Sequence, residues 1–160
     1  MPRKLKIYLD TSVINFIYAD DAPEKKDVTL DFFNNYLNEY DVFISSIVYD
    51  EIDNTRSEIK KLLLYEAIKR YNLKTFNEIN NEIVKIAQIY IDKNIIPVSK
   101  FEDAMHIAFA TFYEFDILLS WNFKHLANIN KQVLVNAINT SIGYNKPLLL
   151  FNPMEVIYEK

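Results

Sequence analysis

Three acidic residues, Asp10, Glu51 and Asp103, stand where a parallel sheet would bring their side chains together. Asp10 directly follows a short apolar segment, Glu51 comes about one helical turn after a second, and Asp103 begins a helix that precedes a third. Ligands of parallel sheets bind beyond the carboxyl ends of the strands, so we expect the three carboxylates to meet at that edge. The spacing alone is not specific, because 22 acidic residues offer many such triples.

Carboxylates that converge in a half-buried cleft repel one another, and a bound cation relieves that repulsion. Mg²⁺ suits such a site because it prefers hard oxygen ligands in octahedral geometry and keeps several waters. A bound ion of this kind lowers the pKa of a water and stabilises charge that develops on a phosphodiester. A set of oxygen ligands without thiolates favours Mg²⁺ or Mn²⁺ over zinc.

The composition excludes several other kinds of site. The 160 residues include no Cys, which excludes a disulfide scaffold, a thiolate metal site and a Cys nucleophile. Gly143 is the single glycine, so Gly-rich phosphate loops are excluded, and two His cannot form a multi-histidine metal site. A net charge of -4 argues against a generally basic nucleic-acid-binding surface, but it leaves room for a basic rim around an acidic centre.

The sequence predicts a cytoplasmic protein without a membrane partner. Asp10 interrupts the first apolar stretch and no small-residue cleavage site follows, which is not the pattern of a signal peptide. No run approaches the ~20 apolar residues of a membrane span. The absence of Cys is compatible with a reducing compartment.

Short apolar segments alternate with amphipathic ones along the chain. The expected strands are 5–9, 42–44, 117–119 and 148–151, and the main expected helices are 57–71, 78–92, 101–115 and 129–142. Ser99 is expected to cap the third of these helices and Gly143 to end the fourth. The stripe expected to bury helix 57–71 consists of Ile59, Leu62, Leu63, Ala67 and Ile68. This alternation predicts an α/β fold with a parallel sheet covered on both faces.

Four segments also resemble the successive motifs of the PIN domain family, in the family's order and at fitting intervals. They are Leu9–Ile14, Ile44–Ile52, Glu102–Ala108 and Asp116–Leu126. The resemblance covers nearly the whole chain and implies a single domain over 1–160, a three-layer α/β/α sandwich with a short parallel sheet. It also implies a divalent-metal-dependent ribonuclease, since many members of this size are VapC-like toxins of toxin–antitoxin pairs.

Carried over by position, the resemblance makes Asp10, Glu51 and Asp103 the metal-site residues, with Mg²⁺ or Mn²⁺ as cofactor. The family often has a fourth acid where this chain has Asn122. An amide oxygen can ligate or orient a water, but it brings no charge. The expected partners are an RNA substrate, an antitoxin protein and a second copy of the chain.

Each acidic residue also has a simpler interpretation. Asp10 could cap the helix that begins at Thr11. Glu51 could be a solvated surface acid, and its neighbours Asp50 and Asp53 compete for the same role. Asp103 could lie at the rim of a packed stripe.

The remaining candidates have two interpretations as well. Thr11 and Ser12 could bind a carboxylate or a substrate phosphate, or they could serve as helix caps. Lys124 and His125 could contact RNA phosphates, or they could form a solvated loop pair. His106 is interpreted as a packing residue on its helix.

Two functions from different classes follow. The first is a metal-dependent endoribonuclease, held silent by an antitoxin, in which helices 57–71 and 78–92 could pair with a partner. The second is a non-catalytic PIN-like module that binds RNA or protein, motivated by Asn122 and the acidic net charge. A phosphatase-like hydrolase is disfavoured, because position 12 holds Ser where such enzymes usually carry a second Asp.

Overall fold

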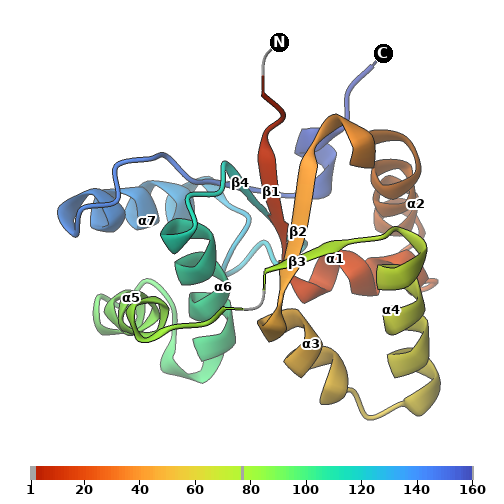
Figure 1. Ribbon diagram of the computed structural model, residues 1–160, viewed down its shortest axis with the longest axis horizontal. Coiled ribbons are helices and arrows are strands. Elements are labelled where there is room, and N and C mark those ends of the chain that lie inside the picture. The colour runs from red at the N-terminus through yellow and green to blue at the C-terminus, as the bar shows by residue number, and fades with distance from the viewer. Residues whose placement is uncertain (1–2, 77, 160) are drawn as a thin grey trace.

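The computed structural model describes residues 3–76 and 78–159, and within them five parallel strands form one sheet in the order β3–β2–β1–β4–β5 (Figure 1). The strands are β1 (Lys6–Leu9), β2 (Asp41–Ser45), β3 (Lys74–Phe76), β4 (Ile117–Leu119) and β5 (Leu149–Phe151). The predicted α/β fold is confirmed. Strand β3 was not predicted, because Lys74-Thr75-Phe76 lacks an apolar run and Lys74 is exposed.

Helices cover both faces of the sheet. They are α1 (Thr11–Asn15), α2 (Pro23–Asp31), α3 (Ser46–Asp53), α4 (Glu58–Arg70), α5 (Asn81–Asp92), α6 (Phe101–Phe112) and α7 (Ile129–Ser141). In Figure 1, α5, α6 and α7 lie to the left of the sheet and α2 and α4 to the right, as expected for a three-layer sandwich. In the part of the chain that the structure describes, no helix is both long and apolar enough to cross a membrane.

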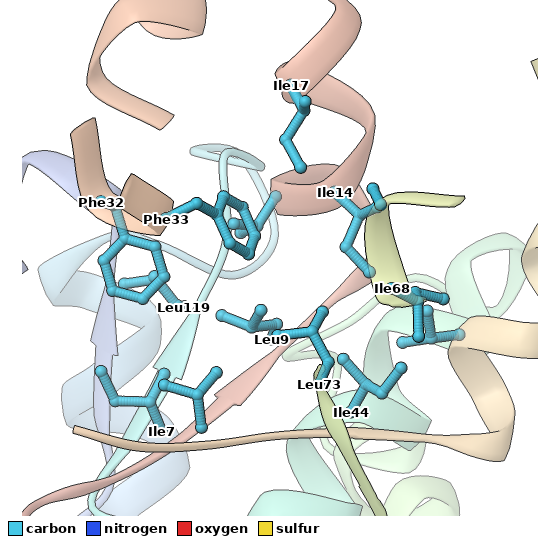
Figure 2. Close-up of a cluster of buried hydrophobic side chains, with 14 of the residues drawn as sticks. Ile7, Leu9, Ile14, Ile17, Phe32, Phe33, Ile44, Ile68, Leu73 and Leu119 are labelled. Atoms are coloured by element: carbon cyan, nitrogen blue, oxygen red, sulfur yellow. The ribbon is translucent and has the colours of Figure 1, made fainter. Parts of the chain in front are cut away.

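The central strand β1 divides the hydrophobic core in two. Successive side chains of a strand point to opposite faces, so Ile7 and Leu9 contribute to one cluster and Tyr8 to the other. Figure 2 shows the first cluster, where Leu9 meets Ile14 of α1 and Ile44 of β2. These buried side chains fix where β1 ends relative to the neighbouring strands, and therefore the position of Asp10.

Side-chain caps explain where several helices begin. Their oxygens accept backbone N–H groups of the first turn, which would otherwise lack partners. These caps are Ser45 for α3, Ser57 for α4, Asn80 for α5 and Asn128 for α7. Gly143 follows α7 with a φ of 97°, so its predicted role as a helix stop is confirmed.

Two local predictions were wrong. Lys100, not Ser99, occupies the N-cap position of α6, and a 3₁₀ turn over Val98–Lys100 carries the chain into the helix. In α4, the predicted stripe residues Ile59 and Leu62 are 75% and 67% exposed. Three consecutive leucines at 62–64 point in different directions around α4, so their spacing could not identify which face packs on the sheet.

A charged cluster secures the amino edge of the sheet. Asp116, just before β4, accepts two hydrogen bonds from the Arg3 guanidinium at 2.7 and 2.9 Å, and a third from the backbone N–H of Lys6 at 2.8 Å. Lys146 lies 3.0 Å from the same carboxylate. The Arg3 hydrogen bond is the main reason that the pKa of Asp116 lies well below its usual range, against the opposing effect of burial.

We predict that this cluster makes stability depend on pH. Asp116→Asn should lower the free energy of unfolding by ~1–3 kcal/mol at pH 7, because charge-assisted hydrogen bonds are lost. The folded-state pKa is depressed, so the contribution is complete above the unfolded pKa and is lost as pH falls through the acidic range below it. Urea unfolding of both proteins at neutral and acidic pH measures this. A difference that stays constant down to pH ~2 would contradict it.

Candidate functional site

A pocket of about 250 Å³ lies beyond the carboxyl ends of β1, β2 and β4. All of its lining residues are of polar or charged types, and they come from segments that are far apart in the sequence. The lining residues are Asp10, Thr11, Ser12, Asn15, Glu51, Thr55, Asp103, His106 and Asn122. The structure therefore places the three predicted acids, Asn122 and both predicted hydroxyl residues around one cavity.

Asp10 is held by two hydroxyl groups. Ser12 Oγ donates to Oδ1 at 2.5 Å, and Ser120 Oγ, which follows β4, donates to Oδ2 at 2.6 Å. Asp10 occupies the N-cap position of α1, but its side chain makes no capping hydrogen bond, so it does not serve as a side-chain cap of this helix. Burial raises the pKa of Asp10, and the charge of His106 and the two hydroxyl groups only partly offset this.

Glu51 is oriented through one of its two oxygens. Its Oε1 accepts a hydrogen bond from Thr11 Oγ1 at 2.9 Å and lies 2.5 Å from His106 Nε2. Within the described part of the chain, Oε2 has no hydrogen-bond partner, and a third of the side chain is exposed. Burial would raise the pKa of Glu51, but the hydrogen bond and charge of His106 outweigh it and the pKa is lowered.

His106 connects the pocket to the core. Its Nδ1 lies 2.7 Å from the Tyr8 hydroxyl, which in turn lies 2.6 Å from Ser45 Oγ. Burial lowers the pKa of His106, but the hydrogen bond to Glu51 more than compensates and the pKa is raised. His106 is buried, as interpreted from the sequence, yet it also orients Glu51. The sequence signal that could have indicated this role is its place one helical turn after Asp103.

Asp103 and Asn122 face each other across the pocket. Asn122 Nδ2 donates to Asp103 Oδ2 at 3.2 Å, while Asn122 Oδ1 accepts the backbone N–H groups of Lys124 and His125. Asn122 therefore both stabilises the turn after β4 and donates to the site. Burial is the main cause of the raised pKa of Asp103.

The predicted substrate-binding residues separate into two groups. Thr11 and Ser12 bind the carboxylates Glu51 and Asp10, and the backbone N–H of Trp121 donates to Ser12 at 2.9 Å. Lys124 and His125 do not line this cavity. They line a neighbouring one, described below.

The donor atoms of the cavity suit a hard divalent cation. Carboxylate and amide oxygens surround it, and Mg²⁺ commonly binds through one or two carboxylates while keeping waters. Over residues 3–76 and 78–159, however, no three His, Cys, Asp or Glu side chains are already grouped as a complete metal-binding set. The chemistry of the donors fits the ion without forming a closed cage, and the cofactor stays a prediction.

No protein-family model matches the chain, and no curated protein matches it significantly. The resemblance to the PIN domain family therefore stays an interpretation of the four sequence segments. Any functional conclusion must be argued from the fold and the cavity.

We predict that the Tyr8 hydroxyl contributes strongly to stability. Tyr8→Phe should lower the free energy of unfolding by ~1–3 kcal/mol, because Ser45 and His106 would each lose a partner in a buried setting. Tyr49→Phe is the matched control, since its hydroxyl meets Thr75 at 3.2 Å in a partly exposed place. Urea unfolding should show a smaller loss for the control, and equal losses would contradict the prediction.

Proposed function

We propose that the protein is a divalent-metal-dependent endoribonuclease that hydrolyses RNA phosphodiester bonds in the cytoplasm, with Mg²⁺ or Mn²⁺ as cofactor. The observation that carries this proposal is the convergence of Asp10, Glu51 and Asp103 in one polar cavity. They come from three separate segments, at the sheet edge where parallel α/β folds bind ligands.

The residues of the cavity would have different roles in catalysis. Asp10 and Asp103 would hold the ion, which when bound lowers the pKa of a water and offsets negative charge on the phosphate. Glu51, ionised and fixed through Oε1, would present Oε2 to the ion or to the attacking water. Asn122 holds Asp103 in place through its amide group without adding charge.

Removing the charge of Asp10 should abolish activity. We expect Asp10→Asn to lower Mg²⁺-dependent cleavage of RNA by ~10²-fold or more and to weaken Mn²⁺ binding in calorimetric titration. Asp50→Asn is the matched control, because Asp50 is exposed and does not line the cavity. Undiminished cleavage by the Asp10 variant would overturn the assignment.

The role of His106 as a positioning residue can be tested separately. His106→Leu should lower kcat by ~10–100-fold, since residues that orient a ligand contribute this much to metal sites. His106→Gln keeps an amide donor that can reach Glu51, so it should recover part of the loss. If His106→Gln folds normally but kcat does not recover, the hydrogen bond to Glu51 is not the cause of the lower kcat.

A non-catalytic RNA- or protein-binding module is the second candidate. Two observations favour it: hydrogen-bond donors already engage all three carboxylates, and Asn122 replaces a fourth acid. Mn²⁺ titration beside a nuclease assay distinguishes the two functions. Metal binding without cleavage of any RNA would favour the module.

We further propose that the nuclease is the toxin of a toxin–antitoxin pair. Exposed Ile59 and Leu62 share one face of α4 and support a protein partner, either an antitoxin or a second copy. Expression in a bacterial host should arrest growth, and the product of an adjacent small open reading frame should relieve the arrest. Arrest that persists in the Asp10→Asn variant would argue against nuclease toxicity.

A further inference from the structure

A second cavity of about 470 Å³ is lined in part by the segment that follows Asn122 of the carboxylate pocket. The end of α5, the turn that follows it, the segment after Asn122 and the first turn of α7 enclose it. Its lining residues are Ile91, Asn94, Ile95, Ile96, Pro97, Val98, Lys124, His125 and Lys131. The lining combines apolar residues of the turn after α5 with the cationic side chains Lys124 and Lys131. Its volume is within the usual range of small-molecule sites, which suits one nucleotide.

Lys124 and Lys131 bring positive charge to this cavity in a protein of net charge -4. Lys131 Nζ donates to the carbonyl of Ile95, which fixes the ammonium group at the wall and leaves two of its N–H bonds for a ligand. Lys124, Lys131 and the nearby Lys100 all act on His125, whose pKa is lowered first by burial and then by these charges. Within the described part of the chain, none of the three lysines is ion-paired.

One residue of the lining has an unpaired buried atom. His125 is 8% exposed, and its Nδ1 finds no hydrogen-bond partner among the described residues. Buried polar atoms are nearly always paired in native proteins, so this side of the cavity is not fully satisfied by the protein itself.

Two short segments join the cavity to the carboxylate pocket. Lys124 follows Asn122 by two positions, and Lys100 precedes Asp103 by three. The charge of Lys100 also reaches Asp103, because it counters part of the effect of burial on the pKa of that carboxyl. The backbone N–H of His125, in the lining of the second cavity, donates to the side chain of Asn122, in the lining of the carboxylate pocket.

We propose that this cavity binds the nucleotide next to the scissile phosphodiester of a single-stranded RNA. Its base would pack against the exposed Pro97 and Val98, since nucleobases taken out of a stack are bound against apolar walls. Its phosphate would contact Lys124 and Lys131. The inference rests on the proposed function and assigns that function a substrate-binding subsite.

The test measures binding without catalysis. Anisotropy of a fluorescein-labelled single-stranded RNA in EDTA reports affinity as a function of salt. Lys124→Gln/Lys131→Gln should weaken binding and reduce the slope of log K against log salt by ~1.4, because the two proposed phosphate contacts are lost. Lys4→Gln/Lys69→Gln removes the same charge at the opposite edge of the sheet, where Lys4 lines another cavity, and should leave the slope unchanged.

The apolar wall has its own matched pair. Val98→Asp places a carboxylate on the wall and should weaken RNA binding, whereas Val84→Asp, on an exposed position of α5 outside the cavity, should not. Equal losses in test and control variants, or none, would overturn the subsite, as would preference for a labelled polyglutamate peptide over RNA. If wild-type protein binds RNA here but never cleaves it when Mg²⁺ is added, the nuclease proposal fails and the nucleotide site stands.

Discussion

The parallel pairing of β1 with both β2 and β4 is the constraint on which the candidate site depends. Leu9 pairs with Leu119, and Tyr8 pairs with Phe43, so the three strands end at the same edge. Asp10 therefore leaves the sheet level with Ser45, the last residue of β2, and Ser120, the residue after β4. The helices that follow or precede these strands bring Glu51 and Asp103 to that edge. A slip of one residue in β1 would also exchange the faces of Ile7 and Tyr8, so the two core clusters fix the site.

Gathering three carboxylates at this edge is costly, and the chain lowers the cost without a lysine or arginine in the lining of the cavity. Hydroxyl groups donate to Asp10, a hydroxyl and an imidazole meet Glu51, and a neutral amide meets Asp103. Burial still raises the pKa of Asp10 and Asp103, so the compensation is incomplete. A neutral Asn122 fits this balance better than a fourth acid, which would add repulsion where the pocket already favours protonation.

The fold and the meeting of the acids could be predicted from the sequence because both follow from short apolar segments. Each such segment marked a strand, and the residue at its end marked the edge. Strand β3 could not be predicted, since Lys74-Thr75-Phe76 has no apolar run and forms by pairing with β2. The link from His106 to Glu51 depends on how α6 packs against α3, which spacing along one helix does not reveal. The separation of Lys124 and His125 from the acids likewise depends on the direction in which the Asn122 turn exits.

The hydrogen bonds that compensate the carboxylates also prepare them for a ligand. An ionised carboxylate has about four lone-pair sites, so one bond to each oxygen of Asp10 leaves room for a cation. Glu51 accepts both of its hydrogen bonds on Oε1. These bonds also fix the direction of Oε2, which accepts no hydrogen bond from any described donor. Side chains held in this way lose little conformational freedom on binding, so more of the interaction energy is available to the ligand. The donors that stabilise the carboxylates would then also favour the binding of a cation between them.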